Sequence, residues 1–107
     1  MNRFNIQIKQ YNLGKDLVIH VTGGAAHIGA VATAYFDEDQ LHVELLQLPH
    51  HKEGELAEEF AELAARKLRS TVTVLMGIHI DHATKEDIQN IIEEVKIGME
   101  EVVSKFA

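Results

Sequence analysis

Alternating apolar and polar residues predict two strands near the start of the chain. A period of two is typical of a strand with one buried face. The first apolar set is Phe4, Ile6 and Ile8, and the second is Leu17, Ile19 and Val21. Because the turn-like stretch YNLGKD separates the two sets, we expect a β-hairpin.

Two further strands follow in the next third of the chain. The segment IGAVATAYF is small and apolar, and LHVELLQL again alternates apolar and polar residues. The polar stretch DEDQ lies between them. This arrangement predicts a second hairpin.

After Pro49 the apolar period becomes helical. One predicted face carries Leu56, Phe60, Leu63, Ala64 and Leu68, and the other carries Glu55, Glu58, Glu59 and Glu62. This separation predicts an amphipathic helix.

The last third predicts a strand followed by a second helix. The stretch STVTVLMGIHI places Val72, Val74, Met76, Ile78 and Ile80 on one side of the fifth strand. Thr84 and Asp87 then have the spacing of a capping box, with Asp87 in place of the usual Glu or Gln. The helical apolar face comprises Ile88, Ile91, Ile92, Val95, Met99, Val102, Val103 and Phe106.

These elements predict a single α+β domain over residues 1–107, in the order ββββαβα. We expect a mainly antiparallel five-stranded sheet with both helices on one face. The uncovered face and the sheet edges also favour a homodimer.

The composition narrows the classes of partner. A net charge of -7 makes nucleic acid or an anionic membrane surface an unfavourable partner, although a local basic pocket could still hold a small phosphorylated ligand. The absence of cysteine excludes disulfides and thiolate chemistry. We see no signal peptide or transmembrane run, so the expected location is the cytoplasm.

The first polar cluster is HVTGGAAHIGA, which contains Gly23, Gly24, His27 and Gly29. The glycine pair suits a tight hairpin turn that needs positive φ. On local sequence the turn is the favoured interpretation, and the alternative is a loop that a ligand approaches closely, with His27 beside it. No Walker or Rossmann pattern is present.

The second cluster, LPHHKEGE, lies between the fourth strand and the first helix. His50, His51 and Lys52 stand next to the helix N-terminus, where unpaired N–H groups favour an anion. A phosphate or carboxylate site and an ordinary solvated loop both fit.

The third cluster lies in VLMGIHIDHATKEDI, where the fifth strand meets the second helix. His79 and Asp81 are two residues apart, so both side chains should leave the face opposite Ile78 and Ile80. They are either a hydrogen-bonded pair at a strand end or ligand contacts.

The three clusters together also offer a possible metal site. His27, His51, His79 and Asp81 carry nitrogen and oxygen donors suited to a divalent metal. Their spacing matches no diagnostic metal motif.

The order of the clusters resembles the LpdD-like prenylated-flavin chaperone family, the small D subunits found with UbiD-type non-oxidative decarboxylases. The resemblance runs from about Gly23 to Ile91 and is strongest in HIGAVA and GIHIDHATKEDI. It implies a homodimer with a fold similar to proteasome assembly chaperones. It also implies binding of prenylated FMN, or FMN, for a partner decarboxylase, with a flavin prenyltransferase as a further partner.

The resemblance assigns the cofactor-binding role to residues in all three clusters. They are Gly23, Gly24, His27, Gly29, His51, Lys52, His79 and Asp81. The sequence departs from the family pattern at His50, where Gly is expected, and at His82, where Asn is expected. We expect the phosphate near Lys52 and the helix start, and an apolar wall from the Ala-rich strand at residues 30–34.

Two other functions fit the same residues. One is a small metal-dependent lyase or isomerase with His79 as the base and Asp81 orienting it. The other is a protein-assembly chaperone that binds no flavin. The resemblance favours an accessory protein without turnover of its own.

Overall fold

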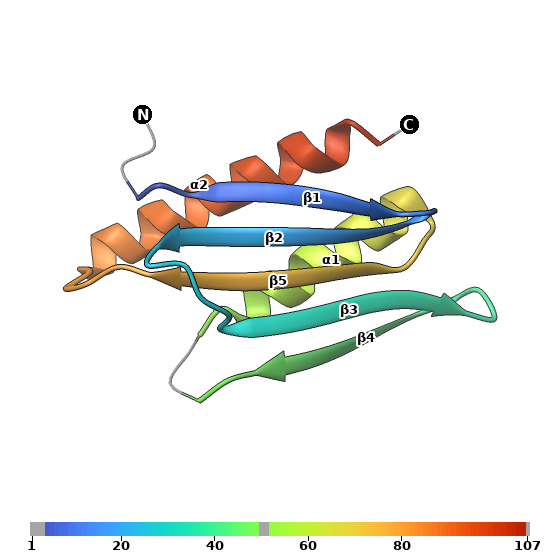
Figure 1. The fold of residues 1–107 in the computed structure, drawn as a ribbon, viewed down its shortest axis with the longest axis horizontal. Coiled ribbons are helices and arrows are strands. Elements are labelled where there is room, and N and C mark those ends of the chain that lie inside the picture. The colour runs from blue at the N-terminus through green and yellow to red at the C-terminus, as the bar shows by residue number, and fades with distance from the viewer. Residues whose placement is uncertain (1–3, 50–51, 107) are drawn as a thin grey trace.

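A five-stranded sheet carries two helices on one of its faces (Figure 1). The computed structural model describes residues 4–49 and 52–106. The strands are β1 (Gln7–Leu13), β2 (Asp16–Gly24), β3 (Ala30–Asp37), β4 (Gln40–Gln47) and β5 (Val72–His79), and the helices are α1 (Gly54–Leu68) and α2 (Lys85–Ser104). The predicted α+β class, element order and one-sided helix layer are confirmed.

The strand order across the sheet is β1-β2-β5-β3-β4. Strand β5 pairs in parallel with β2 and antiparallel with β3, so the sheet is mixed. Because β5 separates β2 from β3, the glycine pair at the end of β2 does not form the tight hairpin turn that we considered. The chain instead crosses β5 between Gly24 and Ala30.

Both predicted hairpins are present, each with a two-residue turn. Leu13 pairs with Asp16 in the first hairpin, and Asp37 pairs with Gln40 in the second. Glu38 and Asp39 both have positive φ, at 53° and 66°. Positive φ at both central residues is the turn geometry that matches the twist of a two-residue hairpin.

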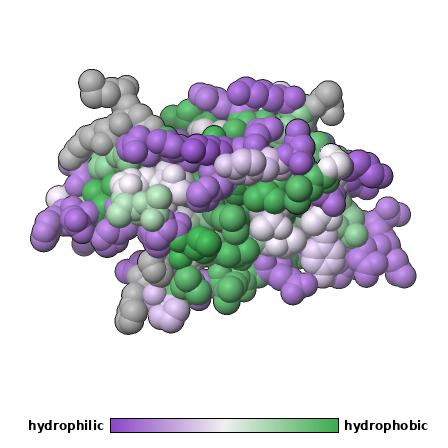
Figure 2. Space-filling model, in the orientation of Figure 1, coloured by the Kyte–Doolittle hydropathy of each residue, from purple (hydrophilic) through white to green (hydrophobic). Residues whose placement is uncertain are grey.

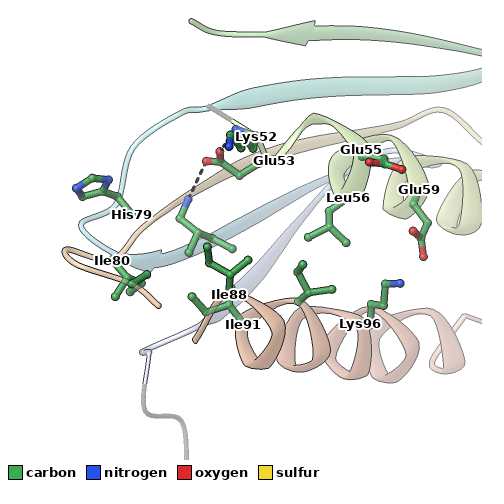
Figure 3. Close-up of a pocket in the computed structure, with 13 residues that line it drawn as sticks. Lys52, Glu53, Glu55, Leu56, Glu59, His79, Ile80, Ile88, Ile91 and Lys96 are labelled. Carbon is green, nitrogen blue, oxygen red and sulfur yellow. Dashed lines mark hydrogen bonds between the residues drawn. The ribbon is translucent and has the colours of Figure 1, made fainter. Parts of the chain in front are cut away.

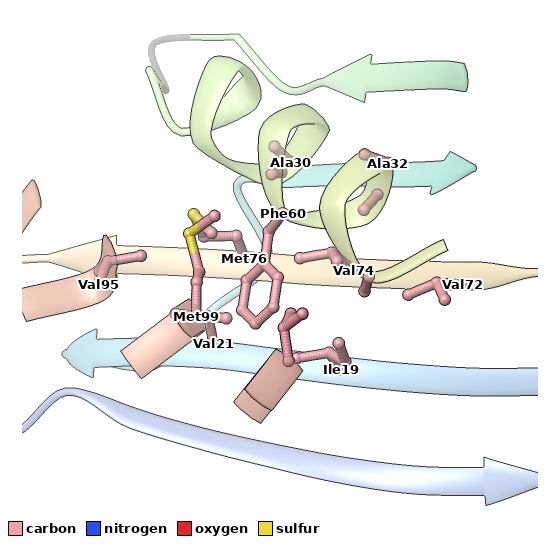
Figure 4. Close-up of a cluster of buried hydrophobic side chains, with 14 of the residues drawn as sticks. Ile19, Val21, Ala30, Ala32, Phe60, Val72, Val74, Met76, Val95 and Met99 are labelled. Carbon is pink, nitrogen blue, oxygen red and sulfur yellow. The ribbon is translucent and has the colours of Figure 1, made fainter. Parts of the chain in front are cut away.

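Helix α1 lies close to the sheet because small residues face each other. Ala30, Ala32 and Ala34 on β3 are fully buried, as are Ala57, Ala61, Ala64 and Ala65 on α1. Figure 4 shows the Phe60 ring extending from this helix into the core toward Met76, Met99 and Ile19. The buried side of α1 is thus richer in alanine than predicted, and Leu63, expected on that side, is exposed.

Helix α2 covers the β1 side of the sheet and starts at the predicted capping box. Thr84 Oγ1 accepts a hydrogen bond from the Asp87 N–H at 3.0 Å, and Asp87 Oδ2 accepts one from the Thr84 N–H at 3.1 Å. Ile91, Val95, Met99 and Val103 are buried. Ile88, predicted on the same apolar face, is 49% exposed because the helix stands away from α1 at this end.

The helix-free face of the sheet mixes apolar and polar residues. Figure 2 shows apolar surface across the middle of this face, bordered by hydrophilic groups. Tyr35 donates a hydrogen bond to Glu44 at 2.9 Å and stacks on His42 at 5.4 Å between ring centroids. The hydrogen bond to Glu44, together with desolvation, raises the pKa of Tyr35.

Candidate functional site

The connection from β2 to β3 lies directly on the end of β5. The Gly24 N–H donates to the Phe4 carbonyl at 3.0 Å, and the Ala25 N–H donates to the His79 carbonyl at 3.1 Å. A Cβ on Gly77 would collide with the His27 carbonyl oxygen, so only glycine allows this close approach. The first polar cluster is therefore in contact with the third.

Glu53 joins this loop to β5 and to the start of α1. Its Oε2 accepts a hydrogen bond from the Ile78 N–H at 3.1 Å, and its Oε1 accepts one from the Lys52 N–H at 2.9 Å. Pairing between β3 and β5 ends at Met76. The Ile78 N–H lies beyond this pairing, and the Glu53 carboxylate accepts its hydrogen bond in place of a strand partner. The side chain is only 12% exposed.

His27 lies between Glu53 and its own loop. Its Nδ1 is 3.0 Å from the Ala25 carbonyl oxygen, and its Nε2 is 3.5 Å from Glu53 Oε2. Its ring also meets His79 edge-on, with 6.2 Å between the centroids. The structure therefore brings together two histidines that are 52 positions apart in the sequence.

His79 and Asp81 form the pair that their spacing predicts. Asp81 Oδ1 is 2.9 Å from His79 Nε2, and the side chains are 57% and 83% exposed. Exposed pairs contribute only about 0 to 1 kcal/mol to stability. The two side chains are therefore a solvent-exposed polar surface at the end of β5.

An apolar cleft of about 560 Å³ opens between α1 and α2 next to His79 (Figure 3). Branched aliphatic side chains line its interior: Leu56, Ile78, Ile80, Ile88, Ile91 and Ile92. Lys52 and His79 lie at one end, while Glu59 and Lys96 point toward each other from the two helices at the other end. Its volume lies within the range of small-molecule pockets.

The sequence-predicted residues divide into two groups. Gly24, His27, Lys52, His79 and Asp81 gather where β5 ends. Gly23 is buried, and its position is close to Ile6 and Ile78, so it serves packing.

Gly29 also has a structural role. Its N–H donates to the Met76 carbonyl and its carbonyl accepts from the Leu48 N–H, both at 2.9 Å. His50 and His51 lie outside the described residues.

The Ala-rich strand at residues 30–34 does not provide the expected apolar wall for a ligand. Ala30, Ala32 and Ala34 have no exposed surface, because α1 packs directly against them. The small side chains bring the helix close to the sheet and leave no room for a ligand. The apolar surface near the polar cluster is the isoleucine-lined cleft instead.

A side chain already accepts a hydrogen bond from one of the N–H groups at the start of α1. The Gly54 N–H donates to Gln47 Oε1 at 3.0 Å, and the Glu53 carboxylate lies one residue before it. A phosphate at this end would therefore depend mainly on the side chains of Lys52 and His79.

The expected metal ligands do not form a cluster among residues 4–49 and 52–106. No group of three or more His, Asp or Glu side chains in this part of the chain has a metal-binding arrangement. Of the candidate set, His27, His79 and Asp81 are described, whereas His51 is not.

Three features of the site were missed in the sequence. Glu53 resembled an ordinary acidic residue before a helix, and its role depends on contacts with the distant residues His27 and Ile78. Lys96 stood in a charged helix with no local signal. The exposed Ile88 and the partly buried Ile80 were placed on apolar faces with no sign that they border a cleft, because periodicity does not reveal where two helices separate.

His82 has a backbone conformation that accounts for the Asn expected at this position in the family. Its φ is 55°, in the left-handed region where Asn is more readily accommodated than most residues. The expected Asn therefore suits this turn on conformational grounds.

A family model described as the prenylated flavin chaperone LpdD-like domain matches residues 1–107, the whole chain. The chain belongs to this LpdD-like family. The resemblance seen in the motifs is thereby confirmed and extends beyond Gly23 to Ile91 to both ends of the sequence. A search of curated proteins found no match. Among the described residues, no helix is long and apolar enough to cross a membrane.

Proposed function

We propose that this protein binds prenylated FMN and acts as a cofactor chaperone or maturation factor for a UbiD-type decarboxylase. Membership of the LpdD-like family supports a role with prenylated flavin. The observation that carries the proposal is the apolar cleft that opens beside Lys52 and His79. A phosphorylated aromatic cofactor needs both an apolar compartment and cationic or N–H groups at one end.

Lys52 and His79 are the proposed phosphate contacts. His79 Nε2 is engaged by Asp81, so Asp81 would orient the ring and direct Nδ1 toward the ligand. His27 and the Gly24 backbone would shape the polar end, because their nitrogen atoms are engaged by Ala25, Glu53 and Phe4, and His51 would be a further contact. Gly23 and Gly29 would hold the loop in place.

The protein would act without turnover of its own. The cofactor would pass between this chain and the decarboxylase, and a flavin prenyltransferase would supply it. We place this exchange in the cytoplasm.

We also propose that two copies associate through the helix-free face of the sheet. Val18, Val31 and Leu75 are only partly buried there, and a second copy would cover them. Light scattering at micromolar concentration should give twice the mass of one chain. A mass of about one chain would reject the dimer and leave flavin binding unaffected.

Anaerobic titration with reduced prenylated FMN tests the main proposal. We expect saturable binding of one flavin per chain, and weaker binding of riboflavin than of FMN because riboflavin lacks the phosphate. Failure of prenylated FMN and FMN to bind would overturn the proposed function.

Variants of the polar end test the phosphate contacts. Lys52→Met and His79→Ala should each weaken FMN binding at least roughly tenfold, or ~1.4 kcal/mol, and should reduce the preference over riboflavin. His42→Ala is the control, because His42 lies on the helix-free face against Tyr35. Unchanged preference in both variants would reject the phosphate assignment.

A further inference from the structure

The two ends of the inter-helix cleft differ in chemistry. The end at Lys52 and His79 offers nitrogen donors, and the Glu53 carboxylate beside Lys52 is occupied by the Ile78 and Lys52 N–H groups. At the opposite end a carboxylate, Glu59 from α1, and an ammonium group, Lys96 from α2, point toward each other (Figure 3). This second end thus provides one hydrogen-bond acceptor and one donor side by side.

The pyrimidine edge of a flavin has the complementary pattern. Its imide N–H is a donor and lies between two carbonyl oxygens, which are acceptors. A carboxylate can accept from the N–H while an ammonium group donates to a neighbouring carbonyl. The charges of Glu59 and Lys96 therefore match a neutral imide better than they match a second phosphate.

The cleft interior fits the rest of the ring system. The positions from Ile88 to Lys96 span about 12 Å along α2 at the usual rise per residue, which is enough for a fused ring system to lie lengthwise. The walls are aliphatic isoleucine and leucine side chains. The additional ring of a prenylated flavin is also aliphatic, so it would lie against these walls without burying an unpaired polar group.

We propose that the flavin ring system lies between α1 and α2, with its pyrimidine edge at Glu59 and Lys96 and its phosphate at Lys52 and His79. This orientation rests on the proposed function and makes Lys96 and Glu59 specificity-determining residues. Helix α2 then contributes directly to cofactor recognition.

Lys96→Met tests the pyrimidine end while keeping an aliphatic side chain. We expect affinity for FMN and for riboflavin to fall by the same factor, at least tenfold, because both share this edge. Lys52→Met should instead affect FMN alone. Lys67→Met, at the last turn of α1, is the matched control and should change neither affinity.

A flavin methylated at the imide nitrogen tests Glu59. Wild-type protein should bind 3-methylriboflavin at least tenfold more weakly than riboflavin, whereas Glu59→Ala should bind the two alike. Equal binding of the two flavins by wild-type protein would overturn the assigned contact.

Filling the cleft provides an independent measurement. Ile92→Trp should abolish binding of FMN and riboflavin while the variant keeps its thermal unfolding transition. If FMN binds wild type but Lys96→Met and Ile92→Trp leave its affinity unchanged, the orientation is wrong and the proposed function stands. If no flavin binds wild type, both fail. A change of mass in Ile92→Trp by light scattering would assign the cleft to a second copy instead.

Discussion

Helix α1 has two interfaces of contrasting kind, one with β3 and one with α2. Where α1 crosses β3, alanine faces alanine, and the interface is closed with no exposed surface on Ala32 or Ala61. Where α1 approaches α2 beyond the end of β5, larger side chains such as Ile80 and Ile88 stay partly exposed and line a cleft. The small side chains thus give the tightest packing, whereas the large ones border open space.

The difference shows that side-chain size alone does not predict where a ligand can enter. A cavity depends on how far apart the backbones lie, and small residues on both sides allow two backbones to approach. The isoleucines of the cleft are apolar enough for a core but have no facing residue to fill the gap. The first two of the following comparisons place one change on each side of this contrast, and the last two concern the polar groups at the end of β5.

The largest effect should come from emptying the core beside the cleft. Phe60 is fully buried, and Phe60→Ala should lower the free energy of unfolding by about 3 to 5 kcal/mol. Leu56, one turn earlier on the same helix, lines the cleft, so Leu56→Ala should lower it by only about 1 kcal/mol. Chemical denaturation measures both, and equal effects would contradict the contrast.

The second-largest effect on stability should come from adding bulk to the closed interface between α1 and β3. Ala32→Leu must displace α1 from β3 and should lower the free energy of unfolding by about 3 kcal/mol. Ala83→Leu makes the same chemical change at the cleft and should leave stability within about 0.5 kcal/mol while it weakens flavin binding. Thermal unfolding and flavin titration of both variants would separate these outcomes. A destabilised Ala83→Leu would mean that the cleft is not open.

A third comparison concerns two carboxylates at the same end of the sheet. Glu53→Ala removes the acceptor from the Ile78 N–H and should lower the free energy of unfolding by about 1 to 3 kcal/mol. Glu55→Ala, two residues on at an exposed position, is the control. If urea denaturation gives the same stability for both variants, Glu53 does not hold the loop to β5.

The smallest effect should follow loss of the exposed pair. Asp81→Ala should change the free energy of unfolding by less than about 0.5 kcal/mol, because the side chain is 83% exposed. The expected consequence is instead weaker FMN binding, since His79 would lose its orientation. A drop in melting temperature with unchanged FMN affinity would make the pair purely structural.

Local patterns predicted the elements well because each depends on neighbouring residues. The alternation around Ile19, the helical period around Val95 and the capping box at Thr84 all occur in the structure. The position of β5 between β2 and β3 could not be read in this way, because its pairing partners are far away in the sequence. That pairing is also what turns the glycine pair from an expected hairpin turn into a crossover.

The candidate site was predictable only in part. His79 and Asp81 do pair, as their spacing suggested, but β5 ends at His79 and Asp81 lies in the turn that follows, so the shared strand face assumed from the sequence is not the reason. The Ala-rich strand was misinterpreted as space for a ligand, although the alanines at 57, 61, 64 and 65 carried a signal for a matching small face on the helix. Lys96 had no such signal, since only the three-dimensional approach of α1 and α2 brings it near Glu59.

The central place of β5 also determines the order in which the chain can fold. During synthesis the hairpins β1–β2 and β3–β4 emerge first, but each keeps an unpaired inner edge until residues 72–79 are available. The sheet is complete only when β5 inserts between the two hairpins, which precede it in the sequence. Such non-local pairing is intrinsically slow. We therefore expect nascent or truncated chains that end before Val72 to expose the unpaired backbone edges of β2 and β3 and to aggregate.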